Sequence, residues 1–296
     1  MLQGTYTALV TPFKDGQVDF DRLAKNVEFQ IEHGLDGVVP VGTTGESPTL
    51  SHAEHRQVIE KTVEAVAGRC QVIAGTGSNS TTEALSLTQH AARQGADMAL
   101  MVNPYYNKPT QEGLYRHFMT VADAVDIPIC LYNIPGRTNV TMTPATVVRL
   151  NAHPNIVAIK EATGSLDIAS EIAHATADQP IAIISGDDSM TLPLMSVGGV
   201  GVISVLSNLL PDKVKAVVDA AAAGDFATAK QKHLELFGLC KGCLTLATNP
   251  IPIKAAMQIA GMDTGEVRLP LTEIEDDGRA KRRALLAEVL PAAAEV

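Results

Sequence analysis

The 296-residue sequence lacks several features that would mark other classes of protein. It has no uninterrupted apolar run of about 18 residues, the length that a membrane-spanning helix needs, and its start does not resemble a signal peptide. It also lacks a surplus of positive charge, because 23 Lys and Arg stand against 33 Asp and Glu, which disfavours nucleic acid or a membrane as partner. We expect a cytoplasmic protein that acts on small molecules.

Cysteine and histidine are sparse as well. Four cysteines are too few for a disulfide framework, and Cys240 and Cys243 lie in a helix-like stretch without a second pair to complete a zinc site. The eight histidines are scattered, and only His52 and His55 have the spacing to share one face of a helix. No P-loop or dinucleotide-binding glycine motif stands at a strand-to-helix turn. We therefore expect no metal and no cofactor.

The sequence does contain a repeated alternation of short apolar runs with segments of helical periodicity. Ser51 with Glu54 and Ser80 with Glu83 have the spacing of capping boxes at the starts of two helices. Eight strand-and-helix units predict a TIM (β/α)8 barrel of the α/β class, because the alternative, an open doubly wound sheet, would expose edge strands. The eight runs are YTALVTPF, GVVPVG, QVIAGT, MALMVN, IPICLYN, IVAIKEA, IAIISGD and GVISV.

The end of the chain has a different composition. From about residue 211 onward the sequence is rich in alanine and has no strand-like run, which is typical of helices. We assign residues 1–224 to the barrel and residues 225–296 to a C-terminal helical extension. No low-complexity linker separates the two parts, so we do not expect independent domains.

A lysine stands at the end of one predicted strand. Residues 156–159 are apolar, and Lys160 and Glu161 follow them directly. Functional residues of a TIM barrel lie where the strands end at its C-terminal face. Burial favours the neutral form of an amine, which is a nucleophile, so Lys160 is a candidate for a Schiff base with a carbonyl substrate. Alternatively, Lys160 extends to solvent or pairs with Glu161.

Two other kinds of residue at strand ends suit binding and proton transfer. The GTTGES segment has glycines for a tight turn and consecutive N–H groups that can bind a carboxylate, with hydroxyls from Thr43 and Thr44. It is equally compatible with a simple turn. Tyr105, Tyr106 and Tyr132 also fall at strand ends, where a tyrosine can transfer protons or fill space.

The segments GTTGES, NPYYNKP, YNIPGRT, IKEATG and SGDD, in this order, resemble the dihydrodipicolinate synthase family of bacterial lysine biosynthesis. The resemblance extends from about residue 4 to the C-terminal helices. GTTGE alone would mark only the wider superfamily of pyruvate-dependent lyases, which includes N-acetylneuraminate lyase. The resemblance implies condensation of pyruvate with L-aspartate 4-semialdehyde to give 4-hydroxy-tetrahydrodipicolinate, without a cofactor.

The resemblance also implies a role for each matching residue. Lys160 forms an imine with pyruvate, whose carboxylate is held by the turn at Thr43 and Thr44. Tyr132 donates and accepts protons, relaying them through Thr43 to Tyr106, which in relatives reaches across from a neighbouring subunit. The implied assembly is a homo-oligomer, commonly a dimer of dimers.

Three further residues match substrate-binding positions of the family. Arg137 matches the arginine that meets the carboxylate of the second substrate, and a guanidinium can bind both carboxylate oxygens. Gly186 and Ile203 match positions that line the pyruvate pocket.

A regulatory site is implied too, because in lysine-inhibited relatives L-lysine binds at a subunit interface. We predict feedback inhibition by L-lysine, although the spacing from Ser80 gives Glu83 an alternative role in helix capping. The residues that match the lysine-binding positions are Ser47, Pro48, His52, His55, Asn79, Glu83 and Tyr105.

Two other functions stay open at this point. One is a related lyase that cleaves a longer sugar acid to pyruvate, against which Arg137 argues because it suits a short carboxylated aldehyde. The other is a barrel without catalysis that serves as a binding or scaffold protein, which fold alone does not exclude.

Overall fold

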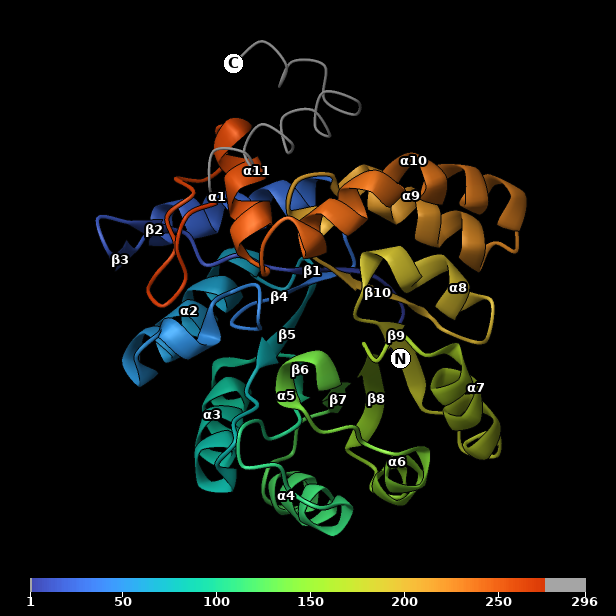
Figure 1. The fold of residues 1–296 in the computed structure, drawn as a ribbon. Helices are drawn as coiled ribbons and strands as arrows, with labels where there is room; N and C mark the ends of the chain where they lie inside the picture. The colour runs from blue at the N-terminus through green and yellow to red at the C-terminus, as the bar shows by residue number, and fades with distance from the viewer. Residues whose placement is uncertain (1, 275–296) are drawn as a thin grey trace.

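The structure, a computed structural model, describes residues 2–274, and its centre is a closed barrel of eight parallel strands. Each strand pairs with the next barrel strand along the chain, and the last pairs with the first (Figure 1). All eight overlap the predicted runs, so the TIM barrel is confirmed and the open sheet is wrong. The strands are β1 (Gly4–Ala8), β4 (Gly37–Val39), β5 (Gln71–Gly75), β6 (Met98–Val102), β7 (Ile129–Asn133), β8 (Ile156–Glu161), β9 (Ala182–Ser185) and β10 (Gly201–Ser204).

Helices connect successive strands and surround the barrel (Figure 1). A short hairpin, β2 (Phe13–Lys14) and β3 (Gln17–Val18), precedes the first helix, and single 3₁₀ turns lie at η1 (Ser47–Thr49), η2 (Asp188–Met190) and η3 (Leu206–Asn208). The helices between strands are α1 (Phe20–Glu32), α2 (His52–Val66), α3 (Thr81–Gln94), α4 (Gln111–Ala124), α5 (Pro135–Thr138), α6 (Pro144–Asn151), α7 (Leu166–Ala175) and α8 (Thr191–Met195).

The starts of α2 and α3 test the two predicted capping boxes. At α2 the box is complete, because the Glu54 N–H donates to the Ser51 hydroxyl (3.2 Å) and the Ser51 N–H donates to the Glu54 carboxylate (2.8 Å). At α3 only half of the prediction is right. The Ser80 hydroxyl accepts from the Glu83 N–H, but the Ser80 N–H donates to the Ser78 hydroxyl instead of the Glu83 carboxylate. The Glu83 carboxylate is thus not engaged in capping Ser80.

The barrel strands are buried on both sides, and their alternation separates two cores. One core fills the barrel interior and includes Ala158 of β8 and Ile203 of β10. The other lies between the strands and the helices and includes Ile159. Because successive strand residues point to opposite sides, Lys160 faces the interior with Ala158, and Glu161 faces the helices with Ile159.

The C-terminal region is helical, as predicted. Helix α9 (Pro211–Ala222) packs against β1 and β10 and completes the ring, α10 (Phe226–Thr245) packs along α9, and α11 (Ile251–Ile259) follows (Figure 1). The boundary placed at residue 224 falls between α9 and α10 and stays a prediction. The final predicted helical stretch, residues 275–296, lies outside the described residues.

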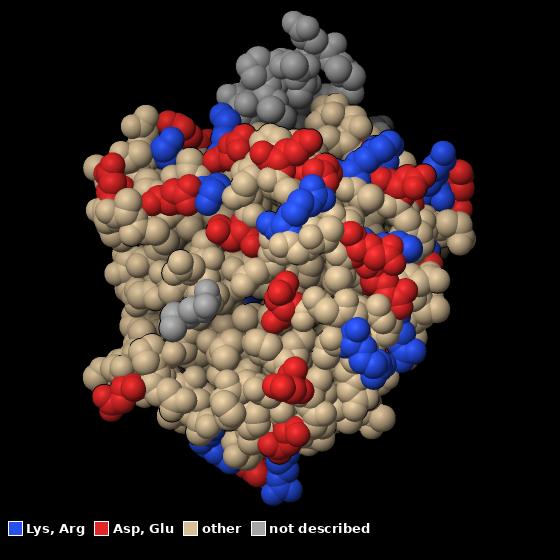
Figure 2. Space-filling model, turned by 180° about the vertical axis from the view of Figure 1, so that it is seen from behind, with Lys and Arg blue, Asp and Glu red and all other residues tan. Residues whose placement is uncertain are grey.

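The surface mixes charges of both signs. On the face drawn in Figure 2, Lys and Arg side chains are interspersed with Asp and Glu side chains. None of the described helices is both long enough and apolar enough to cross a membrane.

Candidate active site

Lys160 lies inside the barrel near the C-terminal end of β8. Its side chain is buried, with 5% of the residue exposed, and its register neighbours are Tyr132 on β7 and Ile184 on β9. The Nζ atom stands 4.3 Å from the centre of the Tyr132 ring. Lys160 therefore does not extend to solvent, which was one alternative for this residue.

Glu161 belongs to the opposite side of the sheet. Its carboxylate accepts hydrogen bonds from the Thr163 N–H (2.6 Å) and from Asn133 Nδ2 (3.3 Å), and its burial raises the pKa of the carboxyl group. Within residues 2–274, Lys160 forms no ion pair with Glu161 or any other carboxylate. The alternative that these neighbours in sequence pair with each other is wrong, because strand alternation points them apart.

The Lys160 side chain fits because its neighbours leave room. A Cβ atom on Gly186 would lie 3.0 Å from Cε of Lys160 and 2.8 Å from Cβ of Ala162, closer than ordinary packing allows. Ile203 is fully buried in the barrel interior. Both residues predicted to line the pyruvate pocket thus belong to the interior of the barrel, and Gly186 directly borders the lysine.

The GTTGES segment forms a tight turn after β4. Val41, directly before the segment, and Glu46, within it, adopt left-handed backbone conformations with φ of 51° and 52°. The Glu46 N–H donates to the Thr43 carbonyl (3.1 Å), while the N–H groups of Thr43 and Thr44 meet no acceptor within residues 2–274. Two consecutive free N–H groups are what an anion-binding turn requires.

The turn borders a cavity of about 230 Å³ at the barrel mouth. Thr43, Tyr132 and Arg137 line it, as do three residues of the predicted lysine-binding set, Ser47, Pro48 and Tyr105. The other lining residues are Val41, Gly42, Gly75, Gly77, Leu100, Val102 and Thr138. Two predicted catalytic residues, Thr43 and Tyr132, thus share one cavity with three predicted regulatory residues, whereas Lys160 and Thr44 are not among its lining residues.

Asn249, which sequence analysis did not single out, connects two predicted substrate-binding residues. Its Nδ2 donates to the buried Thr44 hydroxyl (3.0 Å), and its carbonyl accepts from Arg137 Nη2 (2.9 Å). Asn249 precedes α11, so the C-terminal region contributes to the wall of the site. No local pattern around Asn249 indicated this, because the contact spans 205 positions of sequence.

Tyr106 is placed apart from the cavity. It is 91% exposed and has a left-handed backbone with φ of 73°. Such a conformation is uncommon for a tyrosine and strained. Within one chain, Tyr106 therefore projects into solvent and does not line the cavity with Tyr132 and Thr43.

Glu83, one of the predicted lysine-binding residues, contacts His52 of the same set. One carboxylate oxygen lies 2.6 Å from His52 Nε2, and the other accepts a hydrogen bond from the Ser78 hydroxyl. Glu83 also raises the pKa of the half-buried Tyr105 hydroxyl, although burial is the larger cause. The carboxylate is thus held by the side chains of His52 and Ser78 and not by the helix start, contrary to the capping alternative.

His52 and His55 differ in spite of their shared helix. His52 is exposed, whereas His55 is buried and its Nε2 hydrogen-bonds the Gly75 carbonyl (2.8 Å). Burial lowers the pKa of His55 to about 4. The carbonyl of Asn79 accepts a hydrogen bond from Asn107 Nδ2 (2.8 Å), a residue outside the predicted lysine-binding set.

A model of the dihydrodipicolinate synthetase family matches residues 1–289. This chain belongs to that family. The 4-hydroxy-tetrahydrodipicolinate synthase of Citrifermentans bemidjiense is 54% identical over 288 residues, or 97% of this chain and 99% of the relative. A crystal structure of dihydrodipicolinate synthase from Acinetobacter baumannii complexed with pyruvate is 44% identical, covers 100% of both chains and has a TM-score of 0.95. The Cyanidioschyzon merolae enzyme with lysine bound is 41% identical, with 99% of each chain covered and a TM-score of 0.93.

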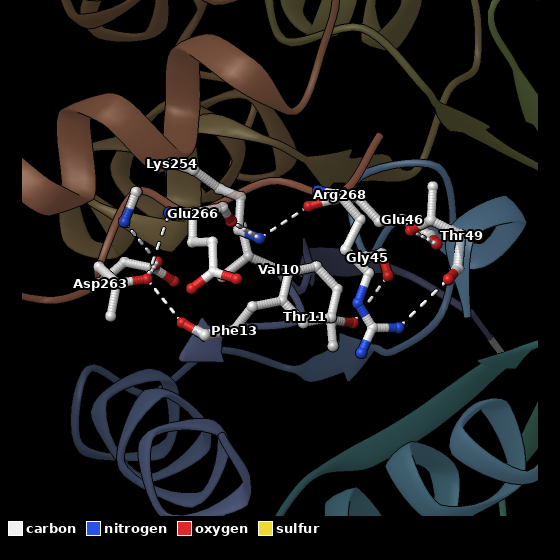
Figure 3. Close-up of polar contacts among 12 residues, drawn as sticks. Val10, Thr11, Phe13, Gly45, Glu46, Thr49, Lys254, Asp263, Glu266 and Arg268 are labelled. Atoms are coloured by element: carbon white, nitrogen blue, oxygen red, sulfur yellow. Dashed lines mark hydrogen bonds and ion pairs between the residues drawn. The ribbon is translucent and has the colours of Figure 1, made fainter. Parts of the chain in front are cut away.

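Membership of the dihydrodipicolinate synthetase family accounts for the fold and the order of the motifs. The sequence analysis did not predict one buried contact. Lys254 of α11 forms an ion pair with Glu46 of the GTTGES turn, with 2.7 Å between Nζ and Oε1 and both side chains fully buried (Figure 3). The sequence feature that could have indicated a buried lysine here is its position inside the apolar segment IPIKAAM, the same kind of feature that marked Lys160.

The cysteine pair of this family member lies in α10. Cys240 and Cys243 are both buried among apolar side chains of α9, α10 and α11. Burial raises the pKa of the Cys240 thiol, which opposes thiolate chemistry. Among residues 2–274, no group of three or more metal-ligating side chains is arranged to hold a metal ion.

Proposed function

We propose that this chain condenses pyruvate with L-aspartate 4-semialdehyde to give 4-hydroxy-tetrahydrodipicolinate, in lysine and diaminopimelate biosynthesis, through a Schiff base on Lys160. Membership of the dihydrodipicolinate synthetase family supports the overall reaction. One observation carries the role of Lys160: its amine is buried inside the barrel near a small cavity and has no carboxylate partner in the described chain.

The proposed chemistry begins when Lys160 Nζ adds to the ketone carbon of pyruvate and water leaves, giving an imine. Loss of a proton from the methyl carbon gives an enamine, whose carbon adds to the aldehyde of the second substrate. The amine of that substrate then adds to the imine carbon, the ring closes, and Lys160 leaves. One water is lost overall, and the aldehyde oxygen becomes the hydroxyl of the product.

The neighbouring residues are assigned to binding and proton transfer. The free N–H groups of Thr43 and Thr44 support a carboxylate site for pyruvate in the turn, with Gly186 and Ile203 shaping its surroundings. Arg137, at the cavity wall, would bind the carboxylate of the second substrate.

Tyr132 would transfer protons at the imine, relayed through Thr43 to Tyr106 of a neighbouring subunit. The exposure of Tyr106 supports this assignment, because a relay residue that serves another subunit must project from its own. We therefore expect a homo-oligomer, a dimer of dimers, with complete sites only in the assembled form.

We further propose that L-lysine inhibits the enzyme by binding at Ser47, Pro48, His52, His55, Asn79, Glu83 and Tyr105. The support is the shared cavity, and the Glu83 carboxylate, which could bind an ammonium group if His52 released it. Activity that is unchanged at millimolar L-lysine would contradict this part of the proposal.

The test of the Schiff base is mass spectrometry after borohydride reduction with pyruvate, followed by peptide mapping. We expect a pyruvate-derived adduct on Lys160 and none in Lys160→Arg, which keeps the charge but removes the nucleophile. No adduct would favour a binding or scaffold protein. An adduct without turnover of aspartate semialdehyde, but with cleavage of a sugar acid, would favour the related lyase.

A further inference from the structure

A single buried ion pair joins the C-terminal region to the turn after β4. Lys254 of α11 and Glu46 of the turn are 208 positions apart in sequence, and both side chains are excluded from solvent (Figure 3). Since neither charge can exchange its partner for water, separation of the two would leave a buried charge unpaired. The pair therefore strongly favours one relative placement of α11 and the turn.

Both carboxylate oxygens of Glu46 accept hydrogen bonds from residues of the C-terminal region. Oε1 accepts from Lys254 Nζ (2.7 Å), and Oε2 accepts from the Arg268 N–H (3.1 Å). Lys254 also donates to the Glu266 carbonyl (2.7 Å), and its Nζ lies 4.2 Å from the centre of the Phe13 ring. The partners of Glu46 are thus themselves fixed by further contacts.

On the other side, Glu46 is part of the turn that carries the two threonines. Its N–H donates to the Thr43 carbonyl, and its left-handed backbone reverses the chain before η1. The preceding residue, Gly45, accepts from the Thr11 hydroxyl (2.7 Å). A displacement of the Glu46 side chain would therefore move the backbone that orients the N–H groups of Thr43 and Thr44.

We propose that Glu46 and Lys254 are positioning residues for the pyruvate carboxylate, through which the C-terminal region keeps the anion-binding turn in its binding geometry. This inference rests on the proposed function, because it requires that the turn binds pyruvate. Neither residue contacts substrate, since both are enclosed between the turn and α11. Their effect is on preorganisation, because N–H groups bind a carboxylate well only when they are held in place beforehand.

The test compares Lys254→Met, Glu46→Gln and the double variant with the unmodified protein. Asn151→Ala is the matched control, because Asn151 makes a reciprocal hydrogen-bonded contact with Gln179 at another part of the barrel. Covalent catalysis with two substrates gives ping-pong kinetics, so kcat/KM for pyruvate and for aspartate semialdehyde report separate half-reactions.

We expect kcat/KM for pyruvate to fall by about tenfold or more in both single variants, and kcat/KM for aspartate semialdehyde by less than about threefold. The double variant should resemble the single ones, because both changes remove the same contact. Asn151→Ala should not lower one of the two kcat/KM values more than the other. If Lys254→Met does not fold, the double variant, which removes both charges of the ion pair, decides the question.

Equal losses in both constants, losses that multiply in the double variant, or unchanged kcat/KM for pyruvate would each overturn the positioning role. Borohydride trapping distinguishes failure of the positioning role from failure of the proposed function. An adduct on Lys160 of the unmodified protein with unchanged pyruvate kinetics in the variants would refute only the positioning role. No adduct in the unmodified protein would refute both, because the turn would have no pyruvate to bind.

Discussion

The two buried lysines among residues 2–274 have opposite surroundings. Lys254 is 0% exposed and donates to the Glu46 carboxylate and the Glu266 carbonyl, whereas Lys160 is 5% exposed and its amine lies over the face of the Tyr132 ring. Burial lowers the pKa of Lys254, and the charge of Glu46 opposes that shift. One amine is therefore part of an ion pair, and the other is buried inside the barrel without a carboxylate partner among the described residues.

The difference shows that burial of a lysine does not by itself indicate its role. A carboxylate partner stabilises the ammonium form and makes the lysine a structural connector. An amine that is not held in such a pair can instead add to a carbonyl carbon as a nucleophile. Four predictions test this comparison, from the largest expected effect to the smallest.

The first prediction concerns the lysine without a carboxylate. Lys160→Arg should reduce kcat by more than about a thousandfold, because a guanidinium keeps the charge but cannot form the imine. The circular dichroism spectrum should remain that of the unmodified protein. Turnover within tenfold of the unmodified protein would contradict the assignment of Lys160 as the nucleophile.

The second prediction concerns the paired lysine. Lys254→Met should lower the free energy of unfolding by about 3–5 kcal/mol, because it leaves the Glu46 carboxylate buried without its partner. Urea unfolding at neutral pH measures the change. Adding Glu46→Gln should recover part of the loss, since the double variant removes both charges of the ion pair. An equal or larger loss in the double variant would show that the ion pair is not the cause.

The same two lysines show what sequence alone predicts. The barrel was predictable because eight apolar runs recur with a regular spacing. The position of Lys160 at the end of a buried strand was predictable because the residue directly follows one of these runs. The partner of Lys254 was not predictable, because no period or local spacing connects it to Glu46 over 208 positions.

Glu83 shows a second limit of sequence patterns. The spacing from Ser80 correctly predicted that Ser80 caps α3, because that contact involves backbone close in sequence. The same spacing could not tell that the Glu83 carboxylate would instead meet His52 of the preceding helix. Contacts between helices depend on how the barrel packs them, which a capping motif does not encode.

The third prediction concerns His55, a buried base that is not a lysine. His55 has its pKa lowered from 6.5 to about 4 by burial, so the folded state disfavours its protonation. A lowered histidine pKa contributes stability that is present above about pH 6.5 and is lost as the pH falls towards 4. Between pH 7.5 and 5 the unmodified protein should lose about 2 kcal/mol more unfolding free energy than His55→Gln.

Urea unfolding of the unmodified protein and of His55→Gln at pH 7.5 and pH 5 measures this difference in unfolding free energy. His117, whose pKa burial also lowers to about 4, is present in both proteins and so contributes equally. Equal pH dependence of the two proteins would mean that His55 is protonated as readily in the folded as in the unfolded state.

The last prediction compares the lysines directly by the same substitution. Lys160→Met should raise the free energy of unfolding by about 1 kcal/mol, in contrast to the loss from Lys254→Met. A methionine fills a similar volume in the barrel interior, and it removes an amine that no carboxylate compensates there. The increase would represent stability given up to keep a nucleophile at this position. A loss of stability comparable to that of Lys254→Met would mean that Lys160 is held by a compensating partner and would remove the physical distinction between the two lysines.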